Sequence, residues 1–221
     1  GWITGFRIDH VDGLFDPQHC FIRLQKACAL ALGETKEKVE RNFYLLIEKI
    51  LGENEKLCPQ WLVFGTTGYD DLNLVNGLFV VTENDEQIKH IYQSFIGRHF
   101  DMSEVMYHCK KLILIISMSS ELYLLAKQLE KVSEQHRWSR DFTLETLRSA
   151  LRDIIASFPV YRSYIRFDDL KVSSQDREYI QRSILAAKSY NPAKDPSIFE
   201  FIQNVLLLED PPGLTEEQIR Y

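Results

Sequence analysis

Residues 5–14 have the sequence Gly5-Phe6-Arg7-Ile8-Asp9-His10-Val11-Asp12-Gly13-Leu14. Successive side chains of a β-strand point to opposite faces. Phe6 and Ile8 are therefore expected on one face, and Arg7 and Asp9 on the other. The stretch predicts a strand with one apolar face and one charged face, ending in a carboxylate.

The residues that follow predict a helix. Asp16 can cap its N-terminus, Pro17 suits its first position, and Gly33 can end it. Between these limits, apolar side chains recur at the spacing of one helix face. A charged loop over residues 34–41 is expected next.

Two further strands are predicted. The run Phe43-Tyr44-Leu45-Leu46-Ile47-Glu48 is apolar until its last residue, and such runs suit parallel strands that are covered on both faces. A third strand is expected over residues 61–64, followed directly by the segment 65–70. Strand, helix, strand, loop and strand are the order of a parallel α/β unit.

Beyond residue 82 the sequence predicts helices only. The longest is expected over residues 103–135, and proline should end helices near residues 159 and 192. The expected helix starts are Thr82, Ser103, Asp141 or Thr143, Ser173 or Ser174, and Asp195. The predicted fold class is mainly α with a minor β part, in two domains over residues 1–80 and 81–221.

Composition excludes several classes of protein. The 221 residues carry 32 acidic and 26 basic side chains, a net charge of -6, without a basic cluster that would bind nucleic acid. No apolar run approaches the roughly 20 residues that cross a bilayer, so no membrane partner is expected. The four cysteines form no CxxC pair, which favours a reducing cytoplasm.

Metal binding is not predicted either. The histidines show no ligand spacing such as HExxH. They are His19, His90, His99, His108 and His136 among others. The segment Gly65-Thr66-Thr67-Gly68 lacks the lysine of a phosphate-binding loop.

Asp9 and Glu48 each stand at the carboxyl end of a predicted parallel strand. In a parallel α/β barrel, reactive side chains come from these strand ends. Retaining glycosidases need two carboxylates about 5–5.5 Å apart, one as nucleophile and one as acid and base. Arg7 on the same face as Asp9 would keep that carboxylate ionised. On spacing alone, capping and loop hydrogen bonding remain an alternative role for these carboxylates.

A family resemblance favours the catalytic interpretation. Residues 5–14 and 47–51 resemble the strand-4 and strand-5 motifs of the α-amylase superfamily. Together with residues 65–70 and 158–164, they are similar to blocks of the maltooligosyl trehalose synthases, in the same order. The resemblance implies a fragment of a (β/α)8 barrel, about strands 4 to 6, followed by a helical subdomain.

The resemblance also implies roles for individual residues. Asp9 would be the nucleophile and Glu48 the acid/base, with Arg7 and His10 beside them. Four more residues would line the glucan cleft: Trp61, Thr67, Tyr69 and Asp70. The implied reaction converts the terminal α-1,4 link of a maltooligosaccharide to α-1,1 through a glycosyl-enzyme, and it needs no cofactor or metal.

Two departures from the family pattern stand out. Asp71 occupies a position where an aromatic residue is expected, and the third catalytic Asp of the family has no counterpart here. That Asp is expected beyond Tyr221, because the apolar start and the capping box at residues 215–218 suggest a piece of a longer protein. Such a piece alone is expected to be inactive.

Two other functions stay open. One is an α-glucan hydrolase of the same superfamily, which would create reducing ends rather than remove them. The other is a non-catalytic helical interaction module that self-associates through exposed strand edges.

Overall fold

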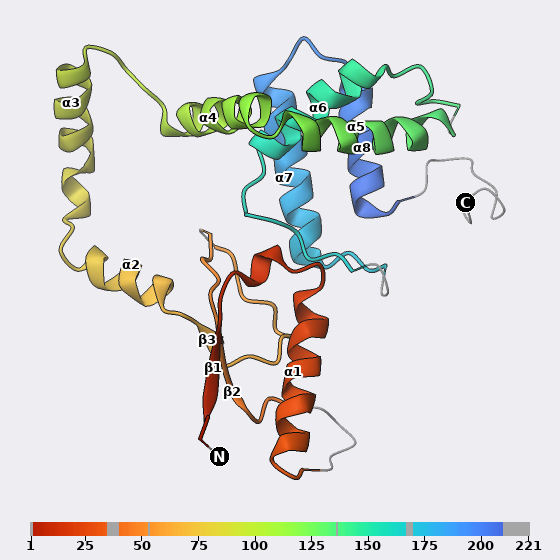
Figure 1. Cartoon of the computed structure of the whole chain (residues 1–221). Helices are drawn as coiled ribbons and strands as arrows, with labels where there is room; N and C mark the ends of the chain where they lie inside the picture. Colours follow the sequence, from red (N-terminus) through yellow and green to blue (C-terminus); the bar gives the residue numbers. More distant parts are fainter. Residues whose placement is uncertain (1, 35–39, 53, 136, 167–169, 210–221) are drawn as a thin grey trace. The chain divides into compact units, whose positions relative to one another are not determined.

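The computed structural model describes residues 2–34, 40–52, 54–135, 137–166 and 170–209 (Figure 1). The charged loop expected over residues 34–41 lies largely outside these ranges, as do His136 and the capping box at residues 215–218. The fold is mainly α with a minor β part, as the sequence predicts. Contacts divide the chain into unit 1, Gly1–Tyr92 with Val160–Tyr164, and unit 2, Gln93–Pro159 with Ile165–Tyr221. The predicted domain boundary near residue 80 stays a prediction.

Unit 1 is built on a parallel sheet of three strands in the order β1-β2-β3. The strands are β1 (Gly5–Ile8), β2 (Tyr44–Ile47) and β3 (Gly65–Thr66). Ile8 is level with Ile47, and Ile47 is level with Thr66. The parallel register brings the carboxyl ends of all three strands to one edge of the sheet.

Helix α1 (Pro17–Ala31) covers one face of this sheet (Figure 1). Its cap is the predicted one, since the Asp16 carboxylate accepts a hydrogen bond from the His19 N–H at 2.8 Å. The sheet face under α1 holds the apolar core of unit 1. The buried members of that core are Val11, Phe21, Leu45, Ile47, Trp61 and Val63.

The opposite face of the sheet is open within the described part of the chain. Phe6 and Ile8 pack on the core, whereas the Arg7 side chain is 51% exposed and Asp9 is 69% exposed. Tyr44 is also exposed, although the apolar run of β2 suggests cover on both faces. The alternation predicted for β1 is therefore confirmed, and β2 is covered on one face only.

The third strand does not lie where the sequence predicts it. Residues 61–64 form no strand, and β3 begins at Gly65. Two side chains take the carbonyls that a ladder would use: Gln25 Nε2 donates to Leu62 O at 2.9 Å, and Arg41 Nη1 donates to Val63 O at 3.1 Å. The pattern of apolar residues cannot show that side chains replace strand partners.

Helix α2 (Tyr69–Gly77) and α3 (Asp85–Ile96) follow the sheet, with a 3₁₀ turn η2 (Thr82–Asn84) between them. Helix α2 is not among the elements that the sequence predicts. Gly68 caps α2 with a φ of 91°, a left-handed conformation that suits glycine, and Asp70 and Asp71 lie in the first turn. Neither helix buries a side chain among the described residues.

Unit 2 is helical around a core of its own. The helices are α4 (Met102–Ile116), α5 (Ser119–Glu134), α6 (Leu144–Ala156), α7 (Ser174–Tyr190) and α8 (Pro196–Leu207). Their predicted caps Thr143, Ser173 and Asp195 each accept a backbone N–H. The largest fully buried core side chains of this unit include Phe199, Leu147, Ile154, Ile180, Ile184 and Ile202.

The long helix predicted over residues 103–135 is two helices. The chain turns at Ser117 and Met118, and α4 and α5 meet at 88°. Both helices pack on α6, which a straight helix could not follow along its whole length. No single helix in the described ranges is long and apolar enough to cross a membrane, while the bent α4–α5 pair meets that criterion by length and composition alone.

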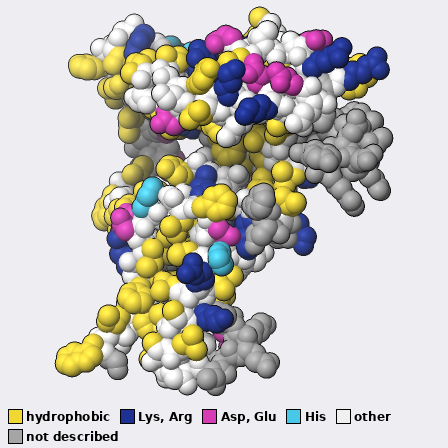
Figure 2. Space-filling model, turned by 45° about the vertical axis from the view of Figure 1, so that its right-hand side comes forward, with side chains coloured by type: hydrophobic (Ala, Val, Ile, Leu, Met, Phe, Trp, Pro, Cys, Tyr) yellow, Lys and Arg dark blue, Asp and Glu magenta, His cyan; other side chains and the backbone are white. Residues whose placement is uncertain are grey.

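Many large apolar side chains lie exposed among charged ones (Figure 2). Several of them stand on or between α2 and α3: Leu72, Leu74, Val75, Leu78, Phe79, Ile88, Ile91 and Phe95. Groups of exposed apolar side chains are typical of surfaces that contact another protein or another chain segment.

Candidate active site

Arg7, Asp9 and Glu48 form one charged group at the carboxyl edge of the sheet. Arg7 Nη1 lies 2.7 Å from Asp9 Oδ1, and Arg7 Nη2 lies 3.3 Å from Glu48 Oε1. One guanidinium therefore bridges two carboxylates from neighbouring strands. The backbone continues this pairing, because the Glu48 N–H donates to Ile8 O at 2.8 Å.

The electrostatics favour an ionised Asp9. The hydrogen bond from Arg7 lowers the pKa of Asp9 most, and a side-chain hydrogen bond with Glu48 lowers it further. The same contact with Asp9 raises the pKa of Arg7. Both shifts have the direction expected from a guanidinium placed beside the Asp9 carboxylate.

His10 joins this group through its backbone. Its N–H donates to Glu48 Oε2 at 3.1 Å. His10 has a φ of 48° and stands at the start of the 3₁₀ turn η1 (Val11–Gly13). Gly13 leaves room for the imidazole, because a Cβ at Gly13 would lie 2.6 Å from His10 Nε2.

The segment after β3, which includes the first turn of α2, contains three of the predicted residues. Tyr69 OH donates to Glu48 Oε1 at 3.4 Å. Asp70 accepts from Thr66 Oγ1 at 3.4 Å, which ties the first turn of α2 to β3. Thr67 Oγ1 is buried and has no hydrogen-bond partner among the described residues.

Trp61 lies elsewhere. It is 5% exposed in the core of unit 1, where its ring meets Phe21 and Tyr164 edge to face at 5.2 and 4.9 Å. The structure thus brings together Arg7, Asp9, His10, Glu48 and Tyr69, but it gives Trp61 a packing position.

A second charged group lies behind the first, on the covered face of the sheet. Lys49 follows Glu48 and points into the core, where its side chain is 1% exposed. Its Nζ lies 3.3 Å from Asp12 Oδ2 and 2.9 Å from Glu55 Oε1. Lys49 has no role predicted from its motif; the signal is a lysine two residues after the buried Ile47, because a lysine in a core position needs buried acidic partners.

Residues 160–164 complete this second group. Tyr164 OH donates to Asp12 Oδ1. Arg162 Nη1 donates to Asp12 O at 3.0 Å and to Leu14 O at 2.7 Å. The block that resembles the family after residue 158 therefore binds the turn that follows β1.

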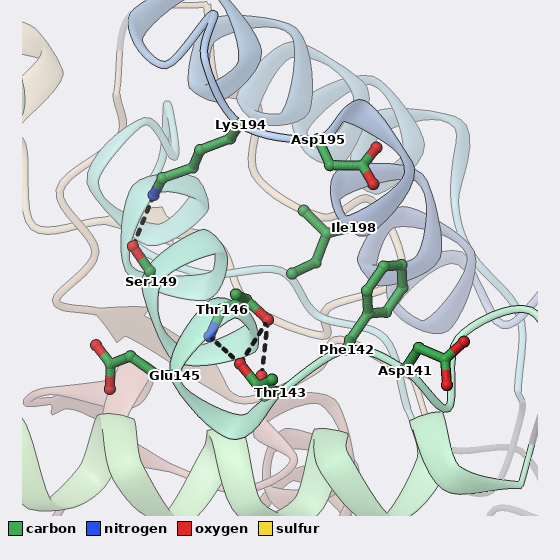
Figure 3. Close-up of a pocket in the computed structure, with 9 residues that line it drawn as sticks. All are labelled: Asp141, Phe142, Thr143, Glu145, Thr146, Ser149, Lys194, Asp195 and Ile198. Carbon is green, nitrogen blue, oxygen red and sulfur yellow. Dashed lines mark hydrogen bonds between the residues drawn. The ribbon is translucent and has the colours of Figure 1, made fainter.

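Unit 2 contains a pocket of about 430 Å³ between the start of α6 and the start of α8 (Figure 3). Several of its polar groups are engaged within the unit. Thr143 Oγ1 accepts the Thr146 N–H, and Lys194 Nζ donates to Ser149 Oγ at 2.7 Å (Figure 3). None of the predicted site residues lines this pocket, so the carboxylates of unit 1 remain the candidate site.

The described part of the chain holds no cluster of three or more His, Cys, Asp or Glu side chains that could bind a metal ion. The candidate site therefore consists of carboxylates, a guanidinium and backbone donors. Such a set can carry nucleophilic and acid–base chemistry on a neutral substrate.

No family model matches the sequence. A Mycobacterium tuberculosis protein with the provisional name maltooligosyl trehalose synthase is 28% identical over 127 residues, which are 58% of this chain and 15% of that protein. The maltooligosyltrehalose synthase of Arthrobacter ramosus matches in structure with a TM-score of 0.69 and 25% identity, over 93% of this chain and 23% of that one. The DSM5389 glycosyltrehalose synthase matches with a TM-score of 0.61 and 28% identity, over 92% and 23%.

The chain spans about a quarter of the length of these solved structures and less of the curated relative. The match in structure reaches both units, since it covers nearly all of the chain. In sequence and in fold, this chain is similar to one part of the maltooligosyl trehalose synthases, as its motifs suggest.

Proposed function

We propose that this chain carries the nucleophile and the acid/base of a retaining α-glucan intramolecular transglycosylase. The observation that carries the proposal is the Arg7 guanidinium that bridges Asp9 and Glu48. One guanidinium reaches both carboxylates only if they lie close together, and a close pair suits a retaining mechanism, whereas inverting enzymes keep room for a water molecule between the two. The three parallel strands would be strands 4 to 6 of a (β/α)8 barrel whose open face is its interior.

In the proposed reaction, the ionised Asp9 attacks the anomeric carbon of the terminal α-1,4 link. Glu48 protonates the departing glycosidic oxygen, and a glycosyl-enzyme forms on Asp9. The anomeric hydroxyl of the released reducing-end sugar then attacks this intermediate while Glu48 takes its proton. The product is a maltooligosyl trehalose with an α-1,1 link, and Asp9 is regenerated as a carboxylate.

The other residues of the site would hold the two carboxylates and the sugar. Arg7 keeps Asp9 ionised, and the His10 N–H and Tyr69 OH orient Glu48. Thr67 Oγ1 is a buried group that lacks a protein partner among the described residues, which suits a contact with a sugar hydroxyl. Asp70 would set the loop between β3 and α2.

The test is an assay of the full-length polypeptide that carries this sequence, on maltopentaose, with Asp9→Asn as the control. We expect reducing ends to disappear with the wild type, non-reducing product to accumulate, and the variant to be inactive. Reducing ends that increase would indicate the alternative, an α-glucan hydrolase of the same superfamily. Reducing ends that do not change, or that disappear equally with Asp9→Asn, would contradict the proposal.

A further inference from the structure

A buried charged group of Lys49, Asp12 and Glu55 lies behind the proposed catalytic pair. Lys49 is the residue after Glu48, and both follow directly on the end of β2. Lys49 is 1% exposed and binds the carboxylates of Asp12 and Glu55 at 3.3 and 2.9 Å. A lysine buried between two acids is held firmly, because the removal of either partner leaves an uncompensated charge in the core.

Asp12 connects this lysine to the turn beside the catalytic group. It belongs to η1, which begins directly after His10. Its carboxylate binds Lys49 Nζ and also accepts from Tyr164 OH. Burial and this contact with Asp12 raise the pKa of Tyr164, so that its hydroxyl stays a donor.

Arg162 holds the backbone of the same turn. Its Nη1 donates to the carbonyls of Asp12 and Leu14, at 3.0 and 2.7 Å. Residues 160–164 thus fasten η1 through one side chain and two backbone carbonyls. The chain between Leu14 and this segment is about 150 residues long, so local sequence alone cannot supply the constraint.

The conformation of η1 determines the position of the backbone N–H that faces Glu48. His10 adopts a left-handed conformation at the start of η1, and its N–H lies 3.1 Å from Glu48 Oε2. A non-glycine residue in this conformation is strained, and such strain persists only where the surroundings hold it. The contacts of Asp12 and Arg162 are surroundings of this kind.

We propose that Asp12, Lys49, Arg162 and Tyr164 are positioning residues that fix η1, and through the His10 N–H fix the carboxylate of Glu48 in place for proton transfer. The inference rests on the proposed function, because it assigns Glu48 the role of acid/base. The described contacts of these four residues converge on η1, beside the His10 N–H that faces Glu48, so they are expected to act on protonation of the leaving group rather than on nucleophilic attack.

The test uses Tyr164→Phe in the full-length polypeptide, which removes one hydroxyl and keeps the ring that packs on Trp61. The kcat/KM is measured on maltopentaose and on α-maltosyl fluoride. Fluoride leaves with little help from an acid, so a displaced Glu48 should lower kcat/KM more on maltopentaose than on α-maltosyl fluoride. We expect the ratio of the two kcat/KM values to fall about 10-fold, a modest part of the roughly 100- to 10,000-fold that acid–base catalysis contributes.

The matched control is Tyr107→Phe in unit 2, where the hydroxyl also donates to a buried carboxylate, Asp153, at 3.0 Å. It should leave the ratio unchanged even if it lowers stability. Where Tyr164→Phe does not fold, Arg162→Lys replaces it, since lysine keeps the charge and loses the fork that binds two carbonyls. Arg162→Lys should lower the same ratio.

The outcomes separate the two proposals. A wild type that does not act on maltopentaose contradicts the proposed function and this inference with it. An active wild type whose ratio is unchanged by Tyr164→Phe, or by Arg162→Lys, overturns the positioning role alone. A ratio that falls equally in Tyr107→Phe also overturns it, because the effect would then follow from stability.

Discussion

The open charged group of unit 1 around Arg7 and the buried group of unit 2 around Asp153 hold carboxylates and cations in opposite ways. In unit 1, Arg7 binds Asp9 and Glu48 on an open face, where the Asp9 side chain is 69% exposed. In unit 2, Asp153 is fully buried and receives Lys111 Nζ at 2.8 Å, Lys194 Nζ and Tyr107 OH. Asn191 Nδ2 donates to the same tyrosine oxygen at 2.9 Å, so that this network is closed on itself.

The difference indicates what each group is for. Exposed ion pairs contribute little to stability, because water and salt screen them. Breaking the contacts of a buried carboxylate that accepts from several donors costs much stability. Its acceptor positions are occupied, so it is not free to bind a substrate. The open group of unit 1 therefore suits chemistry, while the closed group of unit 2 suits the packing of α4, α6 and α7.

The largest effect on stability is expected from Asp153→Asn. The change leaves Lys111 and Lys194 close together without their counter-charge, and it should cost about 3 kcal/mol, near the lower end for a broken buried pair because both lysines keep access to water. Urea unfolding of the chain, followed by circular dichroism at the helix band, measures the loss. Asp141→Asn at an exposed site is the control, and equal losses in both variants would contradict the contrast between the units.

A smaller loss of stability is expected at acidic pH. Burial alone would raise the pKa of Asp153, but the hydrogen bonds from Lys111 and Lys194 outweigh it, and the pKa lies below the ordinary value of 3.8. A carboxylate with a lowered pKa contributes stability above its unfolded pKa and loses that contribution as the pH falls through the folded value. The wild type should thus lose stability below about pH 4 more steeply than Asp153→Asn. Parallel curves for the two proteins would show that Asp153 does not carry this dependence.

Arg7→Met should leave stability unchanged, since the guanidinium is exposed and its partners remain solvated. Activity of the full-length polypeptide on maltopentaose should fall roughly 100-fold, as for other losses of a charge-stabilising group. A marked drop in the urea midpoint, with activity retained, would reverse the roles given to the two units.

The smallest expected effect is that of salt on the pKa values of Asp9 and Asp153. High salt should move the pKa of Asp9 upward toward its ordinary value, because it screens the exposed contact with Arg7. The pKa of Asp153 should move less. Carbon-13 NMR titration of both side chains at low and at 1 M salt compares them, and an equal shift at both sites would contradict the difference in burial.

Local rules predicted much of the fold and of the site. The alternation of β1, the caps of α1, α6, α7 and α8, and the pairing of Arg7 with Asp9 follow from residues within one strand or one helix turn. The parallel pairing of β1 with β2 also agrees with the predicted α/β unit. Glu48 reaches the same group as Asp9 because parallel strands end at one edge.

The predictions that the structure does not bear out depend on contacts between residues that are distant in sequence. Gln25 and Arg41 take the carbonyls of residues 62 and 63 and so move the third strand to Gly65. The bend between α4 and α5 depends on α6, which comes later in the chain. Trp61 is predicted to line the cleft, but Tyr164, about 100 residues further on, completes a core position for it.

Lys49 illustrates the same limit within the site. Its neighbour Glu48 is found by motif, whereas the partners of Lys49 come from η1, from residue 55 and, through Asp12, from residues 162 and 164. Only the folded chain shows that three of the family-like blocks contact each other behind the catalytic pair.

The central claim is that Asp9 is the nucleophile, and it can be tested by trapping the intermediate. Glu48→Gln in the full-length polypeptide, treated with α-maltosyl fluoride, should accumulate a covalent maltosyl adduct. The fluoride leaves without help from an acid, and no base is present to activate the hydroxyl that would release the sugar from the enzyme. Peptide mass spectrometry is expected to place the adduct on Asp9. An adduct on another carboxylate, or none in a protein whose wild type converts maltopentaose, would contradict this account.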